Sequence, residues 1–186
     1  MKRALDVAAS ALLLLLLWPV LLIVILAIRL ESRGPAIFRQ IRVGKDGRAF
    51  TCYKFRTMFT GTGDIPTHQV SASAITPLGD YLRRFKIDEL PQLFNVLAGD
   101  MSLVGPRPCL LSQVELIEAR RRLGVLEVRP GITGLAQVRG IDMSNAERLA
   151  EIDAQYVRSR SLKGDLKLIW ATLRGQGVGV DQVVRT

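Results

Sequence analysis

The stretch from Ala8 to Ile28 contains no charged residue and is almost entirely apolar. As a straight α-helix it would be about 30 Å long, which is enough to cross the hydrocarbon core of a bilayer. A cleaved secretory signal does not fit, because the run is too long and no small-residue cleavage site follows it. We therefore expect this segment to stay on the mature protein and to meet the membrane.

Two features leave the path of this segment open. Pro19 lies in its middle, where the ring removes a backbone hydrogen bond and bends a helix. Positive charges flank both ends, Lys2 and Arg3 before the run and Arg29 and Arg33 after it. The positive-inside bias is then satisfied only if both ends face the cytoplasm. A bent hairpin that enters and leaves one leaflet meets that condition, and a single-pass anchor with a tolerated proline is the alternative.

Composition favours a membrane over nucleic acid as the partner. A chain of 186 residues suffices for one compact domain plus an accessory segment. Its net charge of +9 coexists with 48% hydrophobic residues, and this combination suits a basic domain held against anionic lipid. Basic residues are interleaved with acidic ones, and no helix-turn-helix, zinc-finger or base-stacking signature is evident. We therefore expect no nucleic-acid partner.

The remainder of the chain predicts short helices and one β-hairpin. The hairpin covers residues 36–58 around the turn Gly44-Lys45-Asp46-Gly47. Periodicity and end signals predict helices at Pro77–Phe85, at Leu90–Leu97 closed by Gly99, at Gln113–Leu123, and from a capping box at Ser144–Glu147 through Val157.

Three further segments have less regular patterns. Residues 60–76 predict a loop long enough to serve as a substrate lid. Leucines and Ile169 recur at helical spacing over residues 162–173, so this helix either lies in the lipid interface or packs on the core. The glycines of residues 175–179 follow a helix and open none, which predicts a flexible tail and not a nucleotide-binding loop.

The cysteines and the histidine do not suggest a catalytic or metal-binding site. Cys52 and Cys109 have neither metal-knuckle nor redox-pair spacing, and we expect reduced thiols. His68 is the single histidine, which nearly excludes a His-dependent triad or a multi-His metal site. Any catalysis must therefore use carboxylates, arginine and lysine.

Asp88 and Glu89 are the strongest candidates among the carboxylates. They lie at the expected start of a helix, where the dipole and unpaired N–H groups favour anions and keep a carboxylate ionised. An ionised aspartate can ligate a metal or act as a nucleophile, although an N-cap Asp followed by a first-turn Glu is the ordinary alternative.

Cations in segments bounded by stiff or turn residues accompany the carboxylates. They are Lys54, Arg56, Arg83 and Arg107. Each alone would be an ordinary surface charge, but together with the carboxylates they indicate a phosphate site. The turn-rich segment Arg129–Gly134, which includes Thr133, adds either an anion nest of backbone amides or a plain tight turn.

Four ordered motifs then carry a family resemblance. They are KFRTM at residues 54–58, DELPQLFNV at 88–96, GDMSLVGPRP at 99–108 and RPGITGLAQV at 129–138. Over nearly its whole length the chain resembles the bacterial sugar transferases called small monotopic phosphoglycosyl transferases. The resemblance implies an α/β (α+β) fold: a re-entrant membrane helix-hairpin broken near Pro19, and a mostly helical cytoplasmic catalytic domain with a small β-hairpin and interfacial amphipathic helices.

The resemblance also implies an activity. A sugar 1-phosphate would pass from a UDP-sugar to polyprenyl (undecaprenyl) phosphate, with release of UMP, through a covalent phosphosugar on Asp88. Asp88 and Glu89 are the implied catalytic pair and the implied ligands of Mg²⁺. The implied substrate-binding or phosphate-binding residues are Lys54, Arg56, Arg83, Arg107, Thr133, Gly134 and Gln137.

The expected organisation and partners follow from the same resemblance. Residues 1–34 would form the re-entrant helix and junction, 35–174 the catalytic domain and 175–186 the tail. The partners would be the UDP-sugar, polyprenyl phosphate and membrane lipid, with room for a homodimer. The catalytic domain would lie on the cytoplasmic face of the bacterial inner membrane. A single-pass, membrane-anchored basic adaptor without catalysis is the alternative.

Two departures from the family pattern bear on details. Trp18 precedes the proline where the family usually has a small polar residue. Arg139-Gly140-Ile141-Asp142 stands where the family often continues Asn-Gly-Arg-Asn. The resemblance is therefore weaker evidence for the geometry of the bend and for the contacts to the nucleotide or sugar.

Overall fold

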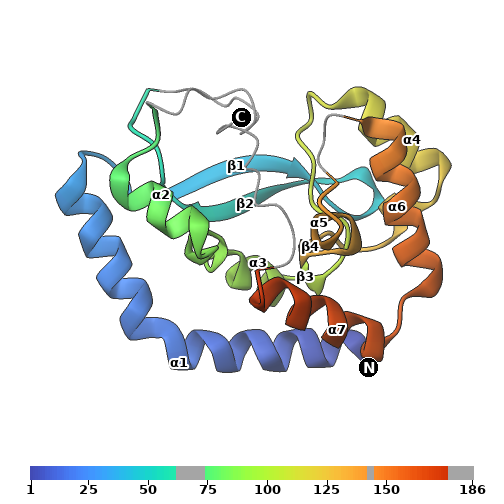
Figure 1. Cartoon of the computed structure of the whole chain (residues 1–186), viewed down its shortest axis with the longest axis horizontal. Helices are drawn as coiled ribbons and strands as arrows, with labels where there is room; N and C mark the ends of the chain where they lie inside the picture. Colours follow the sequence, from blue (N-terminus) through green and yellow to red (C-terminus); the bar gives the residue numbers. More distant parts are fainter. Residues whose placement is uncertain (62–73, 142–144, 176–186) are drawn as a thin grey trace.

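The computed structural model describes residues 1–61, 74–141 and 145–175. The apolar run forms one bent helix, α1 (Lys2–Glu31), with Pro19 inside it (Figure 1). It is followed by β1 (Ile37–Val43), η1 (Lys45–Gly47), β2 (Ala49–Phe55), α2 (Pro77–Arg84), η4 (Ile87–Glu89), α3 (Gln92–Ala98), β3 (Ser102–Val104), α4 (Val114–Arg122), η5 (Val125–Glu127), β4 (Gly131–Thr133), α5 (Leu135–Val138), α6 (Ala146–Ser159) and α7 (Leu162–Leu173).

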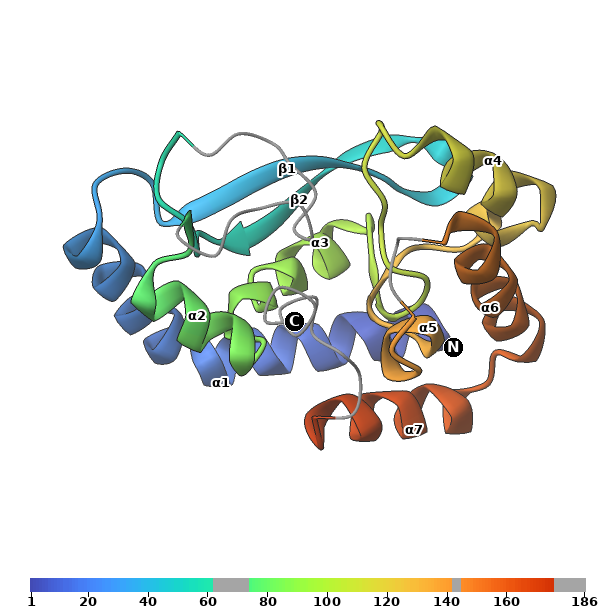
Figure 2. The ribbon, with the colours of Figure 1, turned by 45° about the horizontal axis from the view of Figure 1, so that its top comes forward.

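The first half of α1 is attached to the domain by polar side chains. Lys2 pairs with Asp165 of α7 at 2.6 Å. Arg3 donates to the carbonyl of Val96 near the end of α3 at 2.6 Å. Asp6, which is buried, accepts a hydrogen bond of 2.7 Å from Ser102 of β3. These contacts hold α1 along the underside of the domain, as Figure 2 shows.

The second half of α1 is attached to the same domain by apolar packing and a buried arginine. Leu21, Val24 and Ile28 pack in one cluster with Phe55 of β2 and Leu82 of α2. The guanidinium of Arg56 donates to the carbonyl oxygens of Ile28, Ser32 and Arg33 at 3.3, 2.7 and 2.8 Å. Carbonyls at the end of a helix lack partners and carry partial negative charge, so Arg56 caps α1.

The outward face of α1 is apolar and uncovered. Among the described residues, α1 is the one helix long and apolar enough to span a membrane. Leu15 and Ile23 are 69% and 65% exposed, and Trp18, beside the proline, is 57% exposed. The structure therefore has one continuous helix with a bend, where we expected a hairpin, and both of its ends contact the same domain.

The predicted hairpin is present. β1 and β2 pair antiparallel from Ile37↔Phe55 to Val43↔Ala49, and η1 forms the turn between them. Asp46 adopts a left-handed conformation with φ 57°, which Asp tolerates better than most residues. The hairpin lies across the domain on the far side from α1 (Figure 1).

A second, parallel strand pair escaped the sequence analysis. β3 and β4 pair through Ser102↔Gly131 and Val104↔Thr133. Glycine is required at this junction, because a Cβ on Gly131 would collide with the backbone of Gly105, and a Cβ on Gly134 with the Gly105 carbonyl oxygen. The close approach joins the two loops that follow β3 and precede α5.

The predicted helices are present, with shifted ends. α3 ends at Gly99, which has φ 99° as expected of a C-cap glycine. α6 is capped by Asn145, whose side chain accepts from the Arg148 amide at 2.9 Å. Ser144, the cap that we expected, lies outside the described residues, as do most of the expected lid and nearly all of the expected tail.

The capping of α1 by Arg56 can be tested by substitution. Arg56→Met removes the bonds to the carbonyls of Ile28, Ser32 and Arg33, and we expect the free energy of unfolding to fall by about 3 kcal/mol. The measurement is denaturant unfolding in detergent micelles. Arg39→Met, on the exposed side of β1, is the control and should behave as wild type. Equal stability of the two variants would contradict the capping role.

Candidate active site

Glu89 forms the centre of a charge cluster built from three segments. Its Oε1 atom accepts from Lys54 Nζ of β2 at 2.9 Å and from Arg107 Nη2, in the loop after β3, at 2.6 Å. The Glu89 side chain is only 11% exposed, so both contacts are shielded from water. Charge-assisted hydrogen bonds in such surroundings are strong. They join the hairpin, η4 and the Arg107 loop.

Asp88, the neighbour of Glu89, is available for chemistry. It is 8% exposed, and no hydrogen bond or ion pair joins its carboxylate to another described residue. Both acidic residues lie in η4, ahead of α3, and α3 begins at Gln92. The expectation that they occupy the first turn of the α-helix that follows, where its dipole would stabilise them, is therefore wrong. The neighbouring cations, and not a helix dipole, favour the ionised form of the two carboxyl groups.

Burial and neighbouring charges shift the pKa values of the two acids in opposite directions. Burial, and then the charge of Glu89, raises the pKa of Asp88 to about 6, against the opposing charges of Lys54, Arg83 and Arg107. Burial would also raise the pKa of Glu89, but the charges and hydrogen bonds of Arg107 and Lys54 outweigh it and hold that pKa well below its usual range. The pair therefore has one permanently ionised carboxylate and one that is mostly ionised at neutral pH.

The turn that presents the pair is strained. Lys86 immediately precedes η4 with φ 57°, a left-handed conformation that is uncommon for lysine. α2 ends at Arg84 and α3 begins at Gln92, so this turn connects two helices. Burial lowers the pKa of the Lys86 ammonium. Such strain is often found where a side chain must be held at a particular place.

A buried ion pair holds the backbone of the Arg107 loop in place. Arg120 of α4 binds Asp153 of α6 through Nε at 3.0 Å and Nη2 at 2.6 Å, and both side chains are almost completely buried. Arg120 Nη1 also donates to the carbonyl oxygen of Arg107 at 2.9 Å. The position of the Arg107 backbone, and through it the contact with Glu89, thus depends on two helices from the other end of the domain.

The structure brings together part of the set predicted from the sequence. Asp88, Glu89, Lys54 and Arg107 lie in one cluster, and Arg83 acts on Asp88 through its charge while its Nε donates to Thr57 at 2.9 Å. Arg56 instead caps α1, with its side chain buried against that helix. We therefore do not assign Arg56 to phosphate binding.

The residues of the fourth motif have structural partners. Thr133 Oγ1 and Thr172 Oγ1 of α7 lie 2.5 Å apart. Gln137 Nε2 donates to the Ile132 carbonyl at 3.2 Å, while its buried Oε1 has no partner in the part of the chain that the structure describes. Gly134 provides the close approach to Gly105 described above. The segment therefore forms a tightly packed turn against β3 and α7, and its role toward a ligand stays a prediction.

Arg42 and Lys86 were not among the residues predicted from the sequence. Both interact electrostatically with Glu89 and Arg107. A left-handed lysine leaves no signal in the sequence, and Arg42 lies in a strand with no motif around it. The thiols of Cys52 and Cys109 are free and buried, and burial raises the pKa of each, which makes neither a good nucleophile.

The carboxylates of Asp88 and Glu89 could provide part of the ligand set of a Mg²⁺ ion. Within the described residues no three His, Cys, Asp or Glu side chains gather as a metal cage. Asp88 has no competing partner among the described residues, and the bonds from Lys54 and Arg107 both end on a single oxygen of Glu89. Mg²⁺ commonly uses one or two carboxylates and completes its shell with water and substrate phosphates. Asp88 and Glu89 can supply the two carboxylates.

The support of the Arg107 loop predicts a stability effect. Asp153→Asn leaves the buried Arg120 guanidinium without a compensating charge, and we expect a loss of about 3–5 kcal/mol in the free energy of unfolding. Glu147→Gln breaks the exposed pair with Arg122 between the same two helices and should cost at most about 1 kcal/mol. Denaturant unfolding of both variants makes the comparison. Similar losses would show that Asp153 has no special role.

Comparison with known proteins places the chain in a family. The family model described as bacterial sugar transferase matches residues 1–176. A UDP-glucose:undecaprenyl-phosphate glucose-1-phosphate transferase of Caulobacter vibrioides is 45% identical over 92% of this chain and 68% of its own length. An undecaprenyl-phosphate glucose phosphotransferase of Komagataeibacter xylinus is 42% identical over 93% of this chain.

The chain spans less than half of the length of some of these relatives. The match covers 35% of the Komagataeibacter protein and 39% of a UDP-glucose:undecaprenyl-phosphate glucose-1-phosphate transferase of Klebsiella pneumoniae, which is 41% identical. The shared part nevertheless includes nearly all of this chain, with α1, the Asp88–Glu89 pair and the Arg107 loop inside the matched residues. The chain therefore belongs to the bacterial sugar transferase family.

Proposed function

We propose that this chain transfers a sugar 1-phosphate from a UDP-sugar to polyprenyl phosphate at the cytoplasmic face of the bacterial inner membrane. The observation that carries the proposal is the Asp88 carboxylate, unpaired among the described residues, beside a Glu89 whose charge is balanced by Lys54 and Arg107. The names of the Caulobacter and Klebsiella relatives supply the class of donor and acceptor.

In the first step, an Asp88 oxygen attacks the sugar-linked phosphorus of the UDP-sugar. The new bond joins this oxygen to phosphorus, and the bond from phosphorus to the oxygen bridging the two phosphates breaks, so that UMP leaves with that oxygen. Phosphoryl transfer depends mainly on positioning and on neutralising charge on the phosphate oxygens. Arg83 and the spare N–H groups of Arg107 are the cations best placed to do so.

In the second step, a phosphate oxygen of polyprenyl phosphate attacks the same phosphorus and displaces Asp88. The carboxylate returns to its starting state, and the lipid carries the sugar through a diphosphate. Splitting the transfer lets one site receive a soluble donor and a membrane-bound acceptor in turn. Mg²⁺, when bound by Asp88 and Glu89, would supply further positive charge toward the phosphates.

The attachment of α1 supports a re-entrant path in the membrane. Lys2 and Arg3 at its start, and Ile28 at its end, all contact the same domain. A helix that crossed the bilayer would carry its ends to opposite sides, and one domain could not hold both. The bend and the exposed apolar face near Trp18 suit a helix that dips into a single leaflet.

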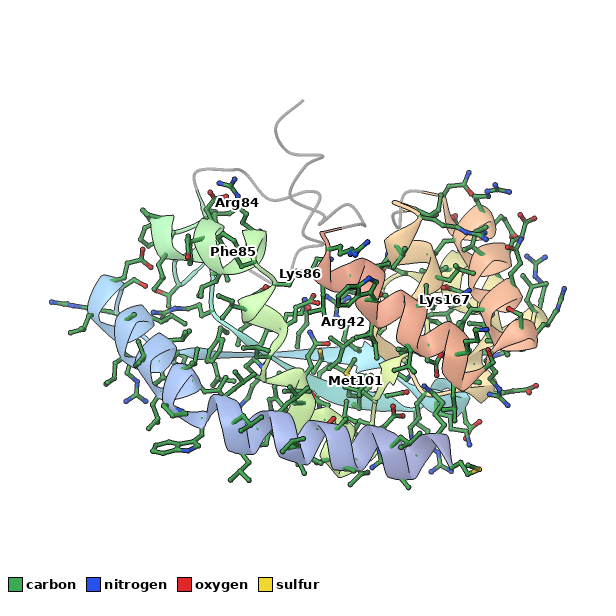
Figure 3. All side chains as sticks on the ribbon, turned by 60° about the horizontal axis from the view of Figure 1, so that its bottom comes forward. Arg42, Arg84, Phe85, Lys86, Met101 and Lys167 are labelled. Carbon is green, nitrogen blue, oxygen red and sulfur yellow. The ribbon has the colours of Figure 1, made fainter. Side chains whose placement is uncertain are left out.

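Two shorter helices offer side chains typical of the lipid interface. On α7, Leu166, Trp170 and Leu173 are exposed, so the helix does not bury its apolar stripe in the core. At the end of α2, Tyr81 and the C-cap residue Phe85 are exposed, and their ring centroids lie 4.6 Å apart. Aromatic residues beside basic ones favour the headgroup region. Figure 3 labels Arg84 at the end of α2 and Lys167 on α7.

Replacement of the nucleophile tests the proposal. Asp88→Asn should lower UMP release from UDP-sugars by on the order of a thousand-fold or more. The raised pKa of Asp88 means that stability is lost as pH rises from about 4 through about 6, so the neutral amide should leave the melting temperature equal or higher. Asp46→Asn, in the exposed hairpin turn, is the control. Robust turnover by Asp88→Asn would remove this residue as nucleophile.

Labelling of introduced cysteines tests the membrane path. Ala4→Cys, in the first turn of α1, and Arg33→Cys, just after its last residue, place single thiols at exposed positions, and the native thiols are buried. We expect an impermeant maleimide to label both from the cytoplasmic side of inverted vesicles. Labelling from opposite sides would instead favour the single-pass adaptor.

A further inference from the structure

Arg42 lies beside the catalytic cluster and has only neutral hydrogen-bond partners. Its Nε donates to the Gln40 side-chain oxygen at 3.0 Å, and Nη2 donates to the same atom. Its Nη1 donates to the Pro108 carbonyl, directly after Arg107, at 3.1 Å. Each terminal nitrogen carries a second hydrogen, and no described residue accepts either of them.

The strand register directs Arg42 toward the site. Gln40 pairs with Cys52 and Phe38 with Lys54. Side chains alternate along a strand, so Arg42 lies on the same face of the hairpin as Lys54, which binds Glu89. In the view of Figure 3, Arg42 lies near the centre of the molecule.

Three arginines that, like Arg42, are not exposed and bind no carboxylate of a described residue have a different source of compensation. Arg3 binds the carbonyls of Val96 and Leu97 at the end of α3, Arg129 binds the carbonyl of Gly99 at the C-cap of that helix, and Arg56 caps α1. Each meets the negative end of a helix dipole. Arg42 meets an amide side chain and a loop carbonyl, which offer much less negative charge.

Electrostatics make this position unfavourable without a ligand. Burial, and then the charge of Arg107, lowers the pKa of Arg42 to about 10, so the guanidinium stays charged at neutral pH. Glu89 is already bound by Lys54 and Arg107. Burying a charge without a partner is costly, and such groups in native structures require an explanation.

We propose that Arg42 binds a phosphate group of a substrate, using the N–H groups of its terminal nitrogens that Gln40 and Pro108 leave unused. This inference rests on the proposed function, because it assigns Arg42 to the same site. The ligand class is a phosphate or diphosphate ester. Its source is either the diphosphate of the nucleotide-sugar or the phosphate of the polyprenyl acceptor.

Direct binding distinguishes the two sources without turnover. The full chain in detergent is titrated with UDP in one arm and with farnesyl phosphate in the other, by isothermal calorimetry. Loss of a charge-assisted hydrogen-bond pair to phosphate should weaken binding in Arg42→Gln by roughly 10- to 100-fold. Arg39→Gln removes a guanidinium from the opposite, exposed face of the same strand and should bind both ligands as wild type does.

A second variant separates phosphate binding from a structural role. Gln40→Glu keeps an oxygen acceptor for Arg42 but adds a negative charge beside it. We expect the melting temperature to be maintained or raised, because the guanidinium gains an ionic partner. The same charge should repel phosphate and weaken binding of the ligand that Arg42→Gln affects.

The outcomes are decisive for Arg42. Weaker UDP binding alone assigns it to the donor, weaker farnesyl phosphate binding alone assigns it to the acceptor, and weakening of both assigns it to a position that they share. Unchanged affinity for both ligands in Arg42→Gln, or in Gln40→Glu, would overturn the inference. A chain that binds phosphate through Arg42 yet releases no UMP from UDP-sugars would disprove the proposed function and leave this inference standing.

Discussion

The ion pairs of Glu89 with Lys54 and Arg107 hold the site in its shape. They join a strand, a short turn and a loop that are distant in the chain, in a place with little access for water. Removing one partner would leave a buried charge that water could not easily solvate. Because Glu89 stays ionised, its charge adds to burial in raising the pKa of Asp88. One acid therefore organises the cluster while its neighbour remains available.

The helix α1 shows how an apolar segment is combined with this charged site. Its inner face carries the few polar groups that bind the domain, among them Asp6 at Ser102 and the carbonyls that Arg56 caps. Its outer face is left to hydrocarbon side chains such as Leu15 and Trp18. Because the same domain holds both ends, the position of the helix and that of the cluster are coupled. The exposed apolar surface of α1 and the charged site are thus connected through one set of contacts with the domain.

Much of the secondary structure could be predicted, because its signals are local. The hairpin follows from alternation around a Gly-rich turn, and the end of α3 follows from Gly99. The β3–β4 pair has strands of three residues each, too short for a periodic pattern, and it depends on the close approach of Gly105 and Gly131. The cap of α6 moved by one residue to Asn145, since neighbouring Ser and Asn have similar capping preference.

The sequence by itself determined that an apolar helix precedes a basic domain, which motifs occur and in what order, and that any catalysis would have to use carboxylates, arginine and lysine. These conclusions need only composition and covalent order. Only the tertiary structure decided what each arginine does. Arg56 caps α1, Arg107 binds Glu89, and Arg42 meets neutral partners. A guanidinium keeps its charge in almost any setting, so its role depends on which acceptor folding brings within hydrogen-bond distance, and those acceptors come from remote segments.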